Sequence, residues 1–250
     1  RVVGQPIRTY RGDARSICSL KLANLMHQSQ FKPLPEIILL DMDGTLLDLR
    51  YDDQFWEQFL PSAYAAHHGI DHETARTDVA ARLKAARGTL TWYNIDHWSE
   101  ELGVNILQLK REYNGLIRYR PGTLDFLQRA KSLAIPTLLA TNAHPDLVEF
   151  KITALHEQGL PFTSFFDAIV TSHQYQAAKE SIDFWAALQN DQSFDPKAAL
   201  FVDDNLAVLK AAATFGIGRC VAVDQPDLSK PPKAVTDYES VTSLDEIQFA

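Results

Sequence analysis

Two aspartates, Asp41 and Asp43, follow the apolar residues 37–40 and precede Gly44, where a turn is expected. A continuous apolar run that ends at a glycine is typical of a strand buried on both faces, as in a parallel sheet flanked by helices. Side chains at i and i+2 leave a strand on the same side, so we expect both carboxylates to point into one crevice at its carboxyl end. Such a pair has the chemistry of a nucleophile and an acid–base group. The alternative is that Asp43 and Gly44 only mark a turn.

Three further polar positions follow strand-like apolar runs. They are Thr141 with Asn142 after residues 136–140, Lys179 after residues 168–170, and Asp203 with Asp204 after residues 199–202. Because the carboxyl ends of parallel strands meet at one edge of a sheet, polar groups at several strand ends predict a common site. Each also has a simpler interpretation: Thr141 and Asp204 as helix N-caps, and Lys179 as a solvated surface lysine.

The elements that must position these residues alternate along the second half of the chain. We predict strands at residues 137–140, 168–170, 199–202 and 220–223, and helices at residues 121–134, 145–158, 180–190 and 205–215, with Pro121 at a first helical position. Alternation of helix and strand indicates βαβ units. The predicted fold class is therefore α/β, with a doubly wound parallel sheet.

Residues 51–118 have a different pattern, rich in helix formers and without a β-branched run. Helices are expected at residues 54–68, 72–87, 94–102 and 105–117, the first three ended by glycines. We expect an all-helical cap domain inserted after the first strand. The predicted organisation is a basic N-terminal arm at residues 1–35, preferred over a transit-like segment, an α/β core at 36–50 and 119–250, and the cap at 51–118.

Bulk composition limits the partners and the compartment. The 250-residue chain has a formal net charge of −8, which argues against a partner that is a nucleic-acid polymer but leaves a mononucleotide open. Cys18 and Cys220 are its two cysteines, so a disulfide framework is not expected and a cytoplasmic location is favoured. No apolar run approaches the roughly 20 residues of a bilayer span, so no membrane partner is expected. Monomer and homodimer both stay open.

The motifs DMDGTLLD, ATN, a lone Lys179 and FVDDN, in this order, resemble those of the haloacid dehalogenase (HAD) superfamily of phosphatases and phosphomutases. The resemblance implies a Rossmann-like core with an inserted cap. More narrowly, LLDMDGTLLDL, the FW of residues 55–56, TLTWYNIDHWSEELG, LLATNAHP, LFVDDN and AAATFGIGRC resemble the bacterial purine 5′-nucleotidases that act on GMP and IMP. Many relatives have a proline directly after the motif lysine, whereas here Glu180 follows.

Physical chemistry assigns roles to the two leading aspartates. Phosphate esters resist attack because a dianion repels nucleophiles, so a site must neutralise charge and hold the attacking and leaving oxygens in line. Asp41 is the expected nucleophile, giving an aspartyl-phosphate. Asp43 is the expected general acid for the leaving oxygen and then the base that activates water. The resemblance adds that tyrosine or alanine at this position of the superfamily would suit dehalogenase or phosphonatase chemistry, so Asp43 favours phosphoester hydrolysis or phosphoryl transfer.

Charge balance indicates the cofactor. Four converging carboxylates around a phosphate dianion repel by about 4 kcal/mol for each neighbouring pair at 4 Å, and Mg²⁺ is the usual oxygen-liganded cation that also touches phosphate. The resemblance implies the following roles: the Asp41 carboxylate, the Asp43 backbone carbonyl and Asp203 as ligands, Asp204 in support, Lys179 as a further positive charge, and the Thr141 hydroxyl and Asn142 N–H as phosphate donors.

Substrate choice is expected to lie in the cap, where Trp92, Tyr93, His97 and Trp98 form an aromatic cluster. A purine base stacked on such a ring gains roughly 1–3 kcal/mol, although helix packing could also explain the cluster. The leading hypothesis is a Mg²⁺-dependent purine 5′-nucleotidase. A sugar-phosphate phosphatase or phosphomutase shares the core. A catalytically silent binding protein is the third possibility, and the retention of Asp41 and Asp43 argues against it.

Overall fold

The computed structural model describes residues 34–249, and within them a six-stranded, fully parallel sheet forms the core. The strand order is β3-β2-β1-β4-β5-β6. The strands are β1 (Ile37–Leu40), β2 (Thr137–Thr141), β3 (Ala168–Thr171), β4 (Ala199–Asp203), β5 (Arg219–Val223) and β6 (Glu239–Val241). Residues 1–33, which hold almost all of the predicted basic arm, lie outside the described part of the chain.

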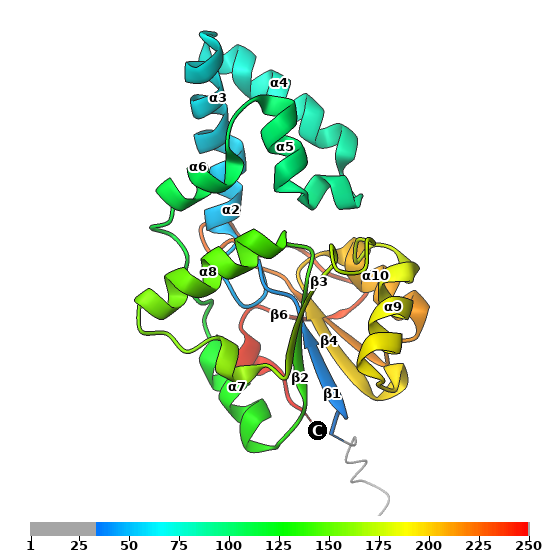
Figure 1. Cartoon of the computed structure of the whole chain (residues 1–250). Coiled ribbons are helices and arrows are strands. Elements are labelled where there is room, and N and C mark those ends of the chain that lie inside the picture. The colour runs from blue at the N-terminus through cyan, green and yellow to red at the C-terminus, as the bar shows by residue number, and fades with distance from the viewer. Residues whose placement is uncertain (1–33, 250) are drawn as a thin grey trace, which may run out of the picture. The chain divides into compact units, whose positions relative to one another are not determined.

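Helices cover both faces of the sheet (Figure 1). Ile38 and Leu40 of β1 pack in one hydrophobic cluster with residues of α7 (Thr123–Ser132) and α8 (Pro145–Glu157). Ile37 and Leu39 pack in a second cluster with residues of α9 (Ile182–Gln192) and α10 (Leu206–Phe215). Since successive strand side chains face opposite sides, a continuous apolar strand fills two cores. The predicted α/β fold with a doubly wound parallel sheet is confirmed.

The strand order places a crevice beside the first strand. β1 pairs with β2 on one side and with β4 on the other, so the direction of winding reverses between β1 and β4. Open α/β sheets bind ligands outside the carboxyl ends of the strands at this switch point. Asp41 follows β1 and Asp203 ends β4, so the topology brings these two carboxylates to the same crevice.

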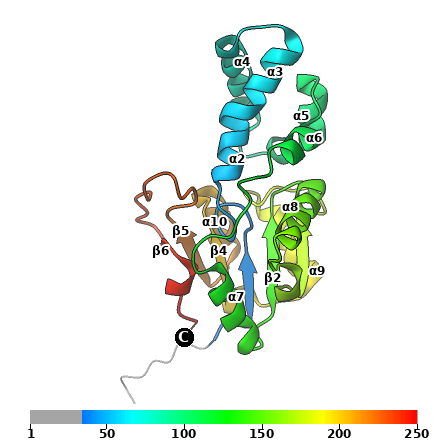
Figure 2. The ribbon, with the colours of Figure 1, turned by 90° about the vertical axis from the view of Figure 1, so that its left-hand side faces the viewer.

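Between β1 and α7 the described chain forms helices and no strand. The elements are α2 (Arg50–Gln54), the π-helical η1 (Phe55–Phe59), α3 (Leu60–His68), α4 (His72–Ala86), the 3₁₀ turn η2 (Leu90–Tyr93), α5 (Ile95–Leu102) and α6 (Ile106–Glu112). We call residues 50–112 the helical insertion. Figures 1 and 2 place it beyond the carboxyl ends of the strands, on the side where the crevice opens.

Several predicted boundaries were wrong for local reasons. α7 begins at Thr123 and not at Pro121, because Gly122 adopts a left-handed conformation (φ 74°) that interrupts the helix. α6 ends at Glu112, five residues early, ahead of an Asn-Gly pair that favours a turn. α9 begins after its N-cap Ser181, so Glu180 lies before the helix. β6 was missed since it is three residues long and mostly exposed.

Among residues 34–249, none of the helices is both long enough and apolar enough to cross a bilayer.

Candidate active site

Asp41 and Asp43 occupy the turn that leaves β1. The Asp41 N–H donates to the Val202 carbonyl at 3.0 Å, which extends the β1–β4 pairing by one residue. Gly44 closes the turn by donating its N–H to the Leu47 carbonyl at 2.8 Å. Gly44 has φ 88°, and a Cβ there would lie 2.7 Å from the Asp204 carboxyl carbon. Glycine is therefore required twice, for its conformation and for the close approach of Asp204.

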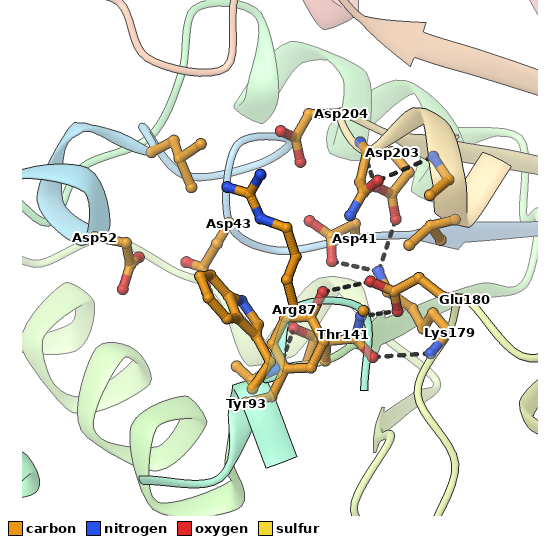
Figure 3. Close-up of a pocket in the computed structure, with 18 of the residues that line it drawn as sticks. Asp41, Asp43, Asp52, Arg87, Tyr93, Thr141, Lys179, Glu180, Asp203 and Asp204 are labelled. Atoms are coloured by element: carbon orange, nitrogen blue, oxygen red, sulfur yellow. Dashed lines mark hydrogen bonds and ion pairs between the residues drawn. The ribbon is translucent and has the colours of Figure 1, made fainter. Parts of the chain in front are cut away.

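Lys179 is a buried ion-pair partner and not a solvated lysine. Only 1% of the residue is exposed, and its ammonium lies 2.5 Å from Asp41 Oδ1 and 2.7 Å from Asp203 Oδ2. The ammonium also donates to the Ala140 carbonyl at 2.9 Å. Burial alone lowers the pKa of Lys179, but the charges of Asp203 and Asp41 outweigh it and raise that pKa above its usual value. Lys179 therefore stays charged between these two carboxylates (Figure 3).

Asp41, Asp203 and Asp204 present carboxylate oxygens within 4.8 Å of one another. We call these three residues with Lys179 the strand-end cluster. Asp203 Oδ1 accepts the Asn205 N–H at 2.8 Å, whereas the Asp204 carboxylate accepts no hydrogen bond and makes no ion pair within residues 34–249. Burial, followed by the charges of Asp203 and Asp41, raises the pKa of Asp204 well above its usual value.

The strand-end cluster fits a hard dication. One ammonium cannot neutralise three carboxylates, and carboxylate oxygens are the donors that Mg²⁺ prefers. The unpartnered Asp204 carboxylate marks the position where a further positive charge would be most stabilising. A magnesium ion held by Asp41 and Asp203, with Asp204 beside it, is consistent with this donor set.

Thr141 and Asn142 border the same cluster at the end of β2. The Thr141 hydroxyl accepts the Ala143 N–H at 3.1 Å, and Asn142 Oδ1 accepts the Lys179 backbone N–H at 2.9 Å. The N-cap alternatives for Thr141 and Asp204 are wrong, because His144 caps α8 and Asn205 caps α10.

A second group of charged residues, around the buried Lys110 and Lys151, was not predicted. The ammonium of Lys151 on α8 lies 2.7 Å from Asp43 Oδ1 and 2.7 Å from Asp52 Oδ2, and Lys110 on α6 lies 2.5 Å from Asp52 Oδ1. We call these four residues the helix-borne chain. Burial would raise the pKa of Asp52, but Lys110 and Lys151 lower it to about 2. A sequence signal existed, since Lys151 lies at helical spacing among the buried Leu147, Ala154 and Leu155.

The crevice is a cavity of about 550 Å³. Trp92 and Tyr93 line it, and Tyr93 donates its hydroxyl hydrogen to Glu180 Oε1 at 2.7 Å, which joins the helical insertion to the core beside Lys179. His97 and Trp98 do not line it. Trp98 is 2% exposed and donates its indole N–H to the Trp92 carbonyl at 3.0 Å, so the packing interpretation holds for Trp98. The remaining predicted residues do line the cavity: Asp41, Asp43, Thr141, Asn142, Lys179, Asp203 and Asp204.

The polar residues of the cavity wall that sequence reasoning missed include Arg87 and Glu180. Arg87 is the C-cap of α4. The Glu180 carboxylate accepts hydrogen bonds from the Tyr93 hydroxyl and, at 3.0 Å, from the side-chain amide of Asn142. Neither has a recognisable local signal, because arginine at a helix end and glutamate before one are common surface residues.

Comparison with known proteins agrees with this geometry. A family model described as haloacid dehalogenase-like hydrolase matches residues 35–216. The GMP/IMP nucleotidase YrfG of Escherichia coli (strain K12) is 35% identical over 192 residues, which cover 77% of this chain and 84% of the relative.

Solved structures share the fold at lower identity. A HAD phosphatase from Thermococcus onnurineus aligns with a TM-score of 0.67 at 19% identity, over 84% of this chain and 94% of that one. CbbY from Rhodobacter sphaeroides, in complex with phosphate, aligns with a TM-score of 0.53 at 22% identity, over 85% and 96%. With the family model and the curated relative, these likenesses lead to one conclusion: the chain belongs to the haloacid dehalogenase-like hydrolases.

Proposed function

We propose that this hydrolase cleaves phosphomonoesters with Asp41 as the nucleophile. The observation that carries the proposal is the strand-end cluster, in which Asp41 lies between a buried lysine and two further carboxylates at the floor of a cavity. Attack by an Asp41 oxygen on phosphorus would form an aspartyl-phosphate and break the bond to the leaving oxygen. A fixed carboxylate at this position needs no reorganisation before it attacks.

We further propose that the cluster holds Mg²⁺ through the Asp41 carboxylate, the Asp43 backbone carbonyl and Asp203, supported by Asp204. Bound there, the ion would neutralise phosphate charge and orient the ester. Lys179 would add a second positive charge, and the Thr141 hydroxyl and the Asn142 N–H would donate to phosphate oxygens. In the absence of the ion, burial raises the pKa of Asp41 to about 6 although Lys179 opposes the shift.

Asp43 is the proposed general acid and base. Burial raises the pKa of its carboxyl to about 6 against the opposing charge of Lys151, so the group can exchange a proton near neutral pH. It would protonate the leaving oxygen and then take a proton from the water that hydrolyses the aspartyl-phosphate. Lys151 holds the carboxylate at 2.7 Å and limits its orientation.

The proposed substrate is a purine 5′-mononucleotide, with GMP or IMP preferred. Support comes from the relative named a GMP/IMP nucleotidase and from the Trp92 ring at the wall of a cavity whose volume suits a mononucleotide. The helical insertion would act as the cap that selects the leaving group. We also propose a cytoplasmic location, a basic arm at residues 1–35, a core at residues 36–50 and 119–250, and a cap at residues 51–118.

The test is phosphate release from GMP, IMP, AMP, UMP and several sugar phosphates, with Mg²⁺ or with EDTA. We expect Mg²⁺-dependent release with a preference for GMP or IMP. Asp41→Asn should lower kcat by about 10⁴-fold or more, because the nucleophile is lost. Asp125→Asn, an exposed aspartate on α7, is the matched control and should behave as the parent. Release from sugar phosphates alone would reject the nucleotide but keep the mechanism.

A further inference from the structure

Arg87 lies beside Trp92 in the cavity wall, and the proposed function gives Arg87 no role. Arg87 is the C-cap of α4, and Trp92 lies five residues later, in η2. The guanidinium carbon lies 5.5 Å from the centroid of the Trp92 ring. Figure 3 shows the Arg87 side chain extending into the pocket, on the side of the helical insertion.

The Arg87 guanidinium is available for a ligand. Its helix carries two other arginines, and each is paired: Arg76 with Glu73 at 2.6 Å, and Arg82 with Glu101 at 2.6 Å. Arg87 makes no side-chain hydrogen bond and no ion pair within residues 34–249. Of the three lysines that line the cavity, Lys151 and Lys179 are each held between two carboxylates, whereas Lys233 makes no ion pair within residues 34–249. Arg87 is thus an unpaired planar donor directed at a binding cavity beside an aromatic ring.

The chemistry of this pair selects a class of base. A guanidinium offers parallel N–H donors that match two neighbouring acceptors, such as O6 and N7 of a 6-oxopurine. Adenine presents the N7 acceptor next to an amino group, so one donor would face another donor. The Trp92 ring offers a flat surface on which either purine can stack. Arg87 therefore distinguishes the bases, whereas Trp92 does not.

Resting on the proposed function, we infer that Arg87 is a specificity-determining residue that selects 6-oxopurine monophosphates over adenosine monophosphate by hydrogen bonding to O6 and N7. GMP and IMP share both acceptors, so Arg87 acts equally on the two. The proposed chemistry places the transferred phosphate at the strand-end cluster, on other residues of the same cavity.

The experiment compares kcat/KM of the parent, Arg87→Met, Arg87→Lys and the control Arg76→Met on GMP, IMP, AMP and p-nitrophenyl phosphate, with Mg²⁺. Arg87→Met should lower kcat/KM for GMP and IMP by about 5- to 100-fold and leave AMP and p-nitrophenyl phosphate within about two-fold. Arg87→Lys should recover little, because an ammonium lacks the planar pair of donors. Arg76→Met should match the parent on all four substrates.

Two results would overturn the inference while the proposed function stands. An equal loss on all four substrates, restored by Arg87→Lys, would mean that Arg87 binds phosphate by charge. No change on any substrate would mean that Arg87 contacts no part of the ester. If the parent hydrolyses p-nitrophenyl phosphate but none of the nucleotides, the nucleotidase proposal and this inference both fail. Turnover of p-nitrophenyl phosphate also reports that each variant is folded.

Discussion

The strand-end cluster and the helix-borne chain are both built around buried lysines, and they differ in charge balance. In the strand-end cluster Lys179 faces three carboxylates, and Asp204 has no partner within residues 34–249. In the helix-borne chain two lysines face two carboxylates, and each ammonium lies within 2.7 Å of an aspartate oxygen. A balanced buried group is satisfied within the protein, whereas an unbalanced one requires a ligand charge.

This difference separates two uses of buried charge in one molecule. Asp52, in the balanced group, has its pKa lowered by Lys110 and Lys151 despite burial, while burial and neighbouring charges raise the pKa of Asp204 in the unbalanced one. The helix-borne chain joins α2 and α6 of the helical insertion to α8 and to the Asp43 turn of the core. We therefore expect Lys110, Lys151 and Asp52 to matter for positioning and stability, and the strand-end cluster together with Asp43 to matter for turnover.

Apart from loss of the nucleophile, the largest effect is expected for Lys179→Met, which removes the only ammonium of the strand-end cluster. The variant should lose about 10³-fold in kcat, because charge developing on the phosphoryl oxygens would no longer be neutralised from that side. Initial rates of phosphate release with saturating Mg²⁺ measure this. Lys84→Met, an exposed lysine on α4, is the control. A rate within a few-fold of the parent would show that Lys179 serves the fold only.

Lys151→Met should act mainly on stability. The substitution leaves Asp43 and Asp52 facing each other without the cation that joins them, which typically costs about 3–5 kcal/mol in the free energy of unfolding. Urea unfolding of the variant, the parent and Lys84→Met gives the value. A loss below about 1 kcal/mol would contradict the view that the helix-borne chain ties the insertion to the core.

The smallest effect is expected from the addition of Mg²⁺, measured as a change in Tm. This measurement distinguishes the strand-end cluster from the helix-borne chain most sharply. Mg²⁺ at 100 times its Kd should stabilise the parent by about 2.7 kcal/mol, seen as a rise of about 5–11 °C in Tm. Asp203→Asn should abolish this rise, because it removes a proposed ligand. Asp52→Asn should lower Tm but retain the rise, because the helix-borne chain already holds its own cations. Equal loss of the rise in both variants would remove the distinction between them.

Local sequence pattern was sufficient to predict the fold of the core and the residues that gather at the strand ends. Continuous apolar runs predicted the β1, β2, β3, β4 and β5 strands, because a strand between two helical layers is apolar at every position. The polar residues that follow those runs share one edge of a parallel sheet whatever the loop lengths. Asp41, Thr141 and Asp203 could therefore be placed together without coordinates.

Only the tertiary structure decided which helix-borne side chains reach the site. Lys151 pairs with Asp43 across 108 positions of sequence, and Tyr93 reaches Glu180 across 87. Helix periodicity shows that a face is buried but not what lies opposite it. The ion pairs of Lys151 were therefore not predictable, nor was the fact that Trp92 lines the cavity while Trp98 is packed away from it. Strand ends are aligned by the backbone hydrogen bonds of the sheet itself, whereas helix faces are aligned by side-chain packing that exists only in the assembled fold.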